Sequence, residues 1–204
     1  MLIVGLTGSL GMGKTTAAAH LRARGLPVFD ADAEVHRLYA TTAAPLIETA
    51  FPGATRDGRV DRERLAALLV AEPSRFNKLE AIVHPLVRAS ERAFLNEEAA
   101  QGAEIVVLEV PLLFETGADH RVDATIVVSA PADVQRQRLI SRDGFDEKKV
   151  ERLLARQMPD AEKRLRADFV VDTGRGIEAM NATLDAIIAK LHGRRRRAYA
   201  LFWA

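Results

Sequence analysis

Short, continuously apolar runs alternate along this chain with segments of helical periodicity. Leu2 to Leu6 is the first such run, and similar runs occupy Pro27 to Phe29, Ile105 to Leu108, Ala124 to Val128 and Phe169 to Val171. Strands that are buried on both faces of a sheet are uniformly apolar, whereas a half-exposed strand alternates apolar and polar residues. The pattern therefore predicts a central parallel sheet with helices on both faces.

The segments between these runs read as helices. Apolar residues recur at helical spacing from Leu79 to Phe94, where Pro85 is expected to kink the helix or to start a new one. The stretch from Pro131 to Arg166 is predicted to be helical, and a last helix is predicted from Ile177 to Leu191. The turn-rich stretch from Pro52 to Gly58 gives no sign of a strand.

A glycine-rich loop follows the first apolar run directly. Gly8-x-x-x-x-Gly13-Lys14-Thr15 matches the phosphate-binding loop pattern without departure. Glycines let successive N–H groups turn toward a polyanion, and the following helix adds the positive end of its dipole. Lys14 is expected to contact the outer phosphates of ATP, and the Thr15 hydroxyl is expected to hold Mg²⁺. The predicted ATP-binding residues are Gly8, Gly11, Met12, Gly13, Lys14, Thr15 and Thr16.

The alternative is a glycine-rich turn that precedes a helix by chance. The apolar run before the loop and the helix-forming alanines after it favour the functional interpretation. We therefore expect an α/β protein with the three-layer P-loop NTPase fold. Residues 1–32 and 102–204 would form a nucleotide-binding core with a helical lid at about 136–166, and residues 33–101 an all-helical acceptor-binding insertion.

The class of P-loop enzyme can be narrowed by what the chain contains. It lacks the Asn-Lys-x-Asp motif with which GTPases read the base, and motor ATPases usually need longer chains. A small-molecule kinase needs a group that orients the acceptor hydroxyl, and Asp32, after the second strand, is the candidate. Asp30 suits the alternative role of helix cap. Glu109 follows a buried strand and is predicted to support Mg²⁺, although a solvated strand end is the plainer interpretation.

Arginines are frequent in the predicted lid, where positive charge would act on the transferring phosphoryl group. Arg138 and Arg142 lie four residues apart and so share one helical face, and Arg156 is a third candidate. Most arginines of this segment are better explained as a solvated helix surface.

Several blocks occur in the order found in the dephospho-CoA kinase family, which this chain resembles over nearly its whole length. They are Leu6-Thr7-Gly8 through Thr15, Asp30-Ala31-Asp32, His84-Pro85, Pro111-Leu112-Leu113-Phe114-Glu115, Arg142-Asp143-Gly144, Arg156 and Asp172-Thr173-Gly174. The resemblance implies transfer of the ATP γ-phosphate to the ribose 3′-hydroxyl of dephospho-CoA, the last step of coenzyme A biosynthesis. It also implies that Asp32 activates the acceptor and that Arg138 and Arg142 act from the lid. His84, Pro85, Leu112 and Glu115 would shape the acceptor pocket.

Three positions depart from the usual family pattern. Ser9 stands where the family usually has a second glycine, Glu109 where it has Asp, and Thr173 where it commonly has Asn. None of these differences removes a charge, so we expect activity to be retained.

Composition adds few constraints. Lys and Arg number 29 against 28 Asp and Glu, a balance that argues against a dedicated nucleic-acid binder, and the absence of cysteine excludes Cys-ligated metal centres. No leader or membrane-spanning run is recognised, so we expect a cytoplasmic protein without membrane or nucleic-acid partners. The basic tail Arg194–Arg197, followed by Tyr199, Phe202 and Trp203, is expected to be disordered or packed. A kinase for another acceptor and a non-catalytic nucleotide- or RNA-associated module stay open, as do the oligomeric state and the choice between ATP and GTP.

Overall fold

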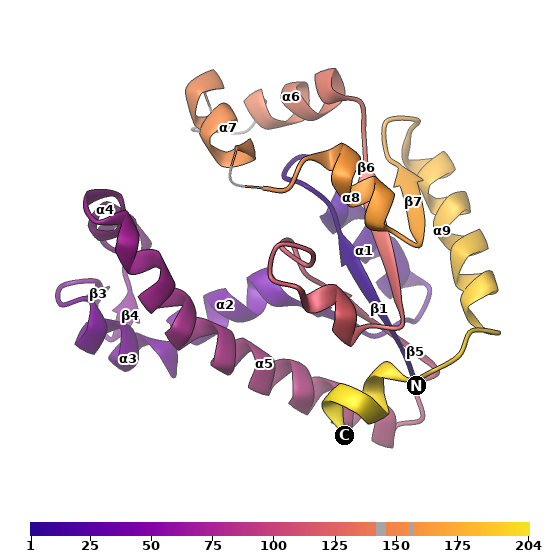
Figure 1. Cartoon of the computed structure of the whole chain (residues 1–204), viewed down its shortest axis with the longest axis horizontal. Coiled ribbons are helices and arrows are strands. Elements are labelled where there is room, and N and C mark those ends of the chain that lie inside the picture. The colour runs from indigo at the N-terminus through magenta and orange to yellow at the C-terminus, as the bar shows by residue number, and fades with distance from the viewer. Residues whose placement is uncertain (142–145, 156) are drawn as a thin grey trace. The chain divides into compact units, whose positions relative to one another are not determined.

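The computed structural model describes residues 1–141, 146–155 and 157–204, and Figure 1 labels its elements. The chain forms two compact units, one of residues Met1–Phe29 with Leu95–Ala204 and one of residues Asp30–Phe94. In chain order the elements are β1 (Leu2–Thr7), α1 (Lys14–Ala23), β2 (Val28–Asp30), α2 (Ala31–Tyr39), α3 (Ala43–Ala50), β3 (Thr55–Arg56), β4 (Arg59–Val60), α4 (Arg62–Ala71), α5 (Phe76–Ala100), β5 (Ile105–Glu109), β6 (Ala124–Ser129), α6 (Ala132–Ile140), α7 (Glu147–Leu154), α8 (Asp160–Arg166), β7 (Phe169–Asp172) and α9 (Ile177–Leu191), with short 3-10 helices at Pro73–Arg75 and Ala118–Arg121 and a π-helix at Tyr199–Trp203.

The five predicted strands form one sheet in the order β2-β5-β1-β6-β7. β1 lies at the centre and pairs in parallel with β5 on one side and with β6 on the other. All six residues of β1 are buried, as the unbroken apolar run predicts. The loops that leave β1 and β5 therefore emerge at the same edge, the carboxyl edge at which open α/β sheets bind ligands.

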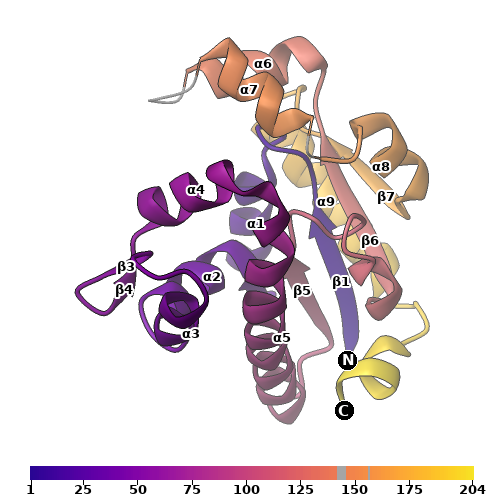
Figure 2. The same ribbon diagram turned by 60° about the vertical axis from the view of Figure 1, so that its left-hand side comes forward.

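The two faces of the sheet are covered by different elements. On one face α1 and α9 lie side by side, as Figure 2 shows, and bury the alternate side chains of β1 in one apolar cluster. On the other face the segment after β5 lies so close that a Cβ at Gly5 would stand 2.7 Å from Leu113 Cδ2. A side chain at Gly5 would therefore need the Leu113 side chain to move, and glycine allows this close approach to the central strand.

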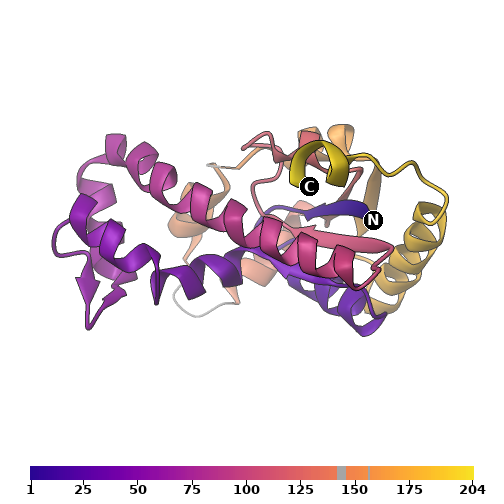
Figure 3. The same ribbon diagram turned by 90° about the horizontal axis from the view of Figure 1, so that it is seen from below.

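The second unit has its own core, centred on Phe51, which is fully buried. The expectation that residues 52–58 contain no strand is wrong, because β3 and β4 form an antiparallel hairpin in this unit, visible in Figure 3. Asp57 and Gly58, which join the two strands, both have positive φ, as Asp-Gly hairpin turns require. The insertion is therefore mostly, but not entirely, helical.

Two helical expectations also need correction or refinement. No new helix begins at Pro85, because α5 is one helix that contains this proline. The segment 131–166 is not one continuous helix: within the described residues it holds α6, α7 and α8, and Pro159 caps the start of α8. A proline restricts the residue before it to extended conformations, which explains a helix boundary here.

The segment that follows the basic residues is packed against the core, although Arg194–Arg197 themselves are exposed. Its π-helix lies beside the start of β1 in Figures 1 to 3. Asp123 joins the two, since its carboxylate accepts from Ile3 N at 2.8 Å, from Arg197 N at 2.7 Å and from Ala198 N at 2.8 Å. Trp203 is 4% exposed and its indole N–H donates to the Arg121 carbonyl at 2.9 Å.

Candidate active site

The phosphate loop joins the buried end of β1 to the first turn of α1. Gly13 is the N-cap of α1 with φ 85°, and Gly11 has φ 81°, so both adopt the left-handed conformation that glycine tolerates. A glycine cap has no side chain to accept from the first N–H groups of the helix. Those donors are available to an anion, in line with the predicted role of the loop.

The first glycine of the loop is required for a different reason. A Cβ at Gly8 would stand 2.5 Å from Val128 Cγ2 and 2.6 Å from the Val128 carbonyl oxygen on β6. Met12, by contrast, is buried, and its Sδ accepts from Ala130 N at 3.1 Å. The loop is thus packed closely against β6 at Val128 and against the residue that follows the strand, Ala130.

Lys14 and Glu109 form an ion pair at the carboxyl edge of the sheet. Lys14 Nζ lies 2.9 Å from Glu109 Oε1, and the two side chains are only 13% and 2% exposed. The other oxygen, Glu109 Oε2, is buried without a hydrogen-bond partner and has Arg22 at 3.6 Å. The plainer interpretation of Glu109 as a solvated strand end is therefore wrong, because this carboxylate is buried beside the lysine of the loop.

Two threonines follow Lys14 in the first turn of α1. Thr15 and Thr16 are both exposed at the helix start. A hydroxyl at this position is open to solvent and to a bound ligand.

Arg138 on α6 lies against the back of the phosphate loop. Its guanidinium donates to Thr173 Oγ1 at 3.0 Å, to the Thr173 carbonyl at 2.7 Å and to the Gly11 carbonyl at 3.4 Å. The other two candidate arginines, Arg142 and Arg156, lie outside the described residues.

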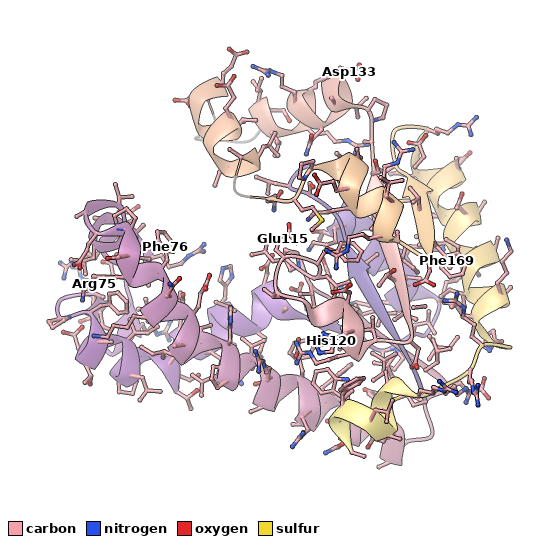
Figure 4. The ribbon with its side chains drawn as sticks, in the orientation of Figure 1. Arg75, Phe76, Glu115, His120, Asp133 and Phe169 are labelled. Carbon is pink, nitrogen blue, oxygen red and sulfur yellow. The ribbon has the colours of Figure 1, made fainter. Side chains whose placement is uncertain are left out.

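The segment after β5 carries two predicted acceptor residues in different settings. Leu112 is 38% exposed, whereas Glu115 pairs with Lys163 of α8, with Nζ 2.8 Å from Oε1 and Lys163 fully buried. Figure 4 labels Glu115 in this segment. Burial by itself raises the pKa of Glu115, but hydrogen bonds from Lys163, from Met158 N–H and from its own N–H outweigh it and lower that pKa.

The remaining predicted site residues belong to the second unit. The Asp30 side chain accepts from Ala33 N at 2.9 Å and is the N-cap of α2, as the capping interpretation expects. Asp32 is exposed in the first turn of the same helix. His84 is half-buried and Pro85 is exposed, both on α5.

Comparison with known proteins decides the family. The model of the dephospho-CoA kinase family matches residues 2–178, which include the phosphate loop, Glu109, Glu115 and Arg138. The chain belongs to the dephospho-CoA kinase family. Membership makes it an ATP-dependent kinase of coenzyme A biosynthesis that phosphorylates dephospho-CoA.

Individual relatives agree with this assignment. The chain is 53% identical over 195 residues to the dephospho-CoA kinase of Mesorhizobium japonicum, covering 96% of this chain and 99% of the relative. A Thermus thermophilus protein of known crystal structure is 39% identical, with TM-score 0.81 over 93% of this chain and 97% of that one. A dephospho-CoA kinase from Campylobacter jejuni, 22% identical, has TM-score 0.67 over 93% and 96% of the two chains and shares the fold.

Some residues of this dephospho-CoA kinase site were missed from the sequence. Gln135 donates to the Leu10 carbonyl at 2.7 Å, and Gln157 accepts from Leu10 N at 2.9 Å. Lys163, the buried partner of Glu115, was missed as well. None of these three residues belongs to a recognisable sequence motif, so only their place in the fold identifies them. The departure of Thr173 from the usual family residue was the one sequence feature that pointed to its segment.

Among the described residues no helix combines the length and apolar character needed to cross a bilayer. The described residues also contain no group of three or more His, Cys, Asp or Glu side chains placed to hold a metal ion.

Proposed function

We propose that this kinase transfers the γ-phosphate of ATP to the ribose 3′-hydroxyl of dephospho-CoA, with the phosphates bound by the loop from Gly8 to Gly13 and the start of α1. The observation that carries the proposal is the loop itself. It presents free N–H groups at a helix start, and an ammonium group stands beside them on Lys14. In the transition state charge develops on the transferred group, and fixed N–H groups and a cation stabilise it without reorganisation.

We propose that Lys14 changes partners during the reaction. In the structure its ammonium group pairs with Glu109 at 2.9 Å. A triphosphate is the stronger anion, so Lys14 turns to the outer phosphates when ATP binds. The Glu109 carboxylate then interacts with Arg22 and with the metal cation that accompanies ATP.

The residues around Glu109 fit a magnesium ion brought in with ATP. Glu109 Oε2 is buried without a hydrogen-bond partner, and the Thr15 hydroxyl is exposed at the helix start. Carboxylate and hydroxyl oxygens are ligands that Mg²⁺ prefers, with the rest of its shell made by phosphate and water. When bound, the ion neutralises charge on the phosphates. Thr15 and Glu109 are the residues proposed to hold it and its waters.

Asp32 is proposed to orient the acceptor hydroxyl and to take up its proton. The cap of α2 is supplied by Asp30, so the exposed carboxylate of Asp32 is not needed for that role. In a loose transition state alignment of the hydroxyl contributes much of the effect of a base. His84, Pro85, Leu112 and Glu115 are proposed to contact dephospho-CoA, with residues 33–101 as the acceptor domain.

Arg138 and Arg142 are proposed to add positive charge at the phosphates, within a lid of about residues 136–166. The enzyme needs the cellular ATP pool, so we place it in the cytoplasm.

The matched pair Asp32→Asn and Asp30→Asn tests the acceptor role. Asn is as good an N-cap as Asp, so Asp30→Asn is expected to keep both fold and turnover. Asp32→Asn is expected to keep ATP affinity and to lose roughly 10²-fold or more in kcat. The assay follows ADP release with Mg-ATP and dephospho-CoA, adenylate or shikimate as acceptor. Equal turnover of the two variants would show that Asp32 has no part in the chemistry.

The same assay tests the activity itself. ADP release that depends on dephospho-CoA and is abolished in Lys14→Ala supports the proposal. Release at the same rate with every acceptor would overturn it and indicate an ATPase.

A further inference from the structure

Side chains from outside the phosphate loop hold three of its consecutive carbonyl groups. The Leu10 carbonyl accepts from Gln135 Nε2 at 2.7 Å, and the Met12 carbonyl accepts from Thr173 Oγ1 at 2.8 Å. The Gly11 carbonyl between them has Arg138 NH1 at 3.4 Å. These donors come from α6 and from the segment after β7, neither of which belongs to the phosphate-loop motif.

The direction of each bound carbonyl fixes the direction of an N–H group. In a planar trans peptide the C=O of one residue and the N–H of the next point in opposite directions. A donor on the Leu10 carbonyl therefore aims the Gly11 N–H away from Gln135. In the same way, the donor on the Met12 carbonyl aims the Gly13 N–H away from Thr173.

The Thr173 hydroxyl is committed to this role by its neighbours. Arginine has no acceptor, so the bond from Arg138 NH1 at 3.0 Å uses a lone pair of the hydroxyl and leaves its proton for another partner. The acceptors within reach are the Met12 carbonyl at 2.8 Å and the Ser129 carbonyl at 3.2 Å. Thr173 is 5% exposed and Gln135 is 8% exposed, so both bonds are shielded from solvent.

We propose that Gln135 and Thr173 are positioning residues for ATP, which hold the phosphate loop with its Gly11 and Gly13 N–H groups turned inward before the nucleotide arrives. The proposal rests on the loop binding the phosphates of ATP, as proposed above. Both side chains bond to carbonyl groups of the loop. Both act through the main chain, by removing the reorganisation that a free loop needs on binding.

The test substitutes each donor without changing its shape. Thr173→Val removes the hydroxyl and keeps the volume, and Gln135→Glu replaces the donating amide with an acceptor that repels the Leu10 carbonyl. Each variant is expected to raise the Kd for Mg-ATP, measured by calorimetry, roughly five- to tenfold. The KM for ATP rises with it, while the KM for dephospho-CoA stays within about twofold. Thr173→Ser, which keeps the hydroxyl, is expected to restore the wild-type Kd.

Two surface substitutions are matched controls. Thr183→Val on α9 makes the same substitution outside the site and removes an exposed hydroxyl that donates to the Ala179 carbonyl of its own helix at 2.8 Å. Gln137→Glu makes the same change as Gln135→Glu at an exposed position of the same helix, α6. Both are expected to leave the Kd for Mg-ATP unchanged.

The outcomes separate this inference from the proposed function. If Lys14→Ala abolishes ATP-dependent turnover while Gln135→Glu and Thr173→Val keep the wild-type Kd, the inference is wrong and the proposed function stands. If the wild-type protein does not bind Mg-ATP, both fail. If the KM for both substrates rises equally, the side chains serve general stability and the inference is also overturned.

Discussion

Removal of the buried Lys163 ammonium group is expected to destabilise the first unit strongly. Lys163 is fully buried, with Nζ 2.8 Å from Glu115 Oε1 and 3.4 Å from the Pro111 carbonyl. Lys163→Met keeps most of the side-chain volume but removes the cation from the Glu115 carboxylate, which is 18% exposed. The carboxylate keeps hydrogen bonds from the Met158 N–H and from its own N–H. A buried charge without its counter-charge is far from water and is not neutralised.

The size of the effect follows from this burial. Breaking a buried ion pair by removing one partner costs about 3–5 kcal/mol of unfolding free energy. For a chain of this size about 1 kcal/mol corresponds to roughly 2–4 °C, so the melting temperature should fall by roughly 6–20 °C. Lys190→Met, the same substitution at an exposed position of α9, is the control and should change the unfolding free energy by less than about 0.5 kcal/mol.

The assay is urea unfolding, followed by circular dichroism and by the fluorescence of Trp203. It compares the single variants Lys163→Met and Glu115→Gln with the double variant that carries both substitutions. The neutral amide removes the unpaired charge, so the double variant should recover part of the loss. The loss of unfolding free energy in Lys163→Met should also shrink as the pH falls, because burial without the cation favours the protonated form of Glu115. If the loss of unfolding free energy in the double variant equals the sum of the losses in the two single variants at every pH, Lys163 and Glu115 do not stabilise the protein as a pair.

Three further outcomes are expected. The pKa values of Glu115 and Asp168 are lowered in the folded protein, so these carboxylates stabilise it above their unfolded pKa values of roughly 4. This stability is lost as the pH falls through the folded pKa values, so the melting temperature should fall steeply below about pH 4. A melting temperature that does not change with pH in that range would contradict this. Trp203→Ala should lower the unfolding free energy by about 3–5 kcal/mol in urea titrations, and a change below about 1 kcal/mol would show that the tail contributes little. Gly58 has φ 74°, so Gly58→Ala should lower the unfolding free energy by about 1–2 kcal/mol in the same titrations. Gly193 has no positive φ and open space around it, so the control Gly193→Ala should leave the unfolding free energy unchanged. Equal losses in the two variants would refute the turn assignment.

The sheet and the phosphate loop could be predicted because their signals are local. A parallel strand buried on both faces must be apolar throughout, as β1 is, and the loop motif requires its residues at fixed spacing. The hairpin β3–β4 was missed because each strand has two residues, too few for alternation to register. Its Asp57-Gly58 turn was the available signal.

The contacts that complete the site join residues far apart in the sequence. Lys163 reads as one more charge on an exposed helix, and only the fold brings it to Glu115. Arg138 was predicted as a site residue from helical spacing and family likeness. Its three hydrogen-bond acceptors on Gly11 and Thr173 could not be predicted from the sequence. Side-chain partners of this kind depend on where helices dock, which no local pattern encodes.

The carboxylate of Asp123 has a consequence for the order of folding. It joins the start of β1, the central strand of the sheet, to the main chain of Arg197 and Ala198. In sequence, Asp123 is 120 residues from its partner on β1 and 74 and 75 residues from the other two. Contacts between such distant segments form slowly, because the loop between them must close before the contact contributes. The amino end of the central strand is therefore expected to be secured late in folding.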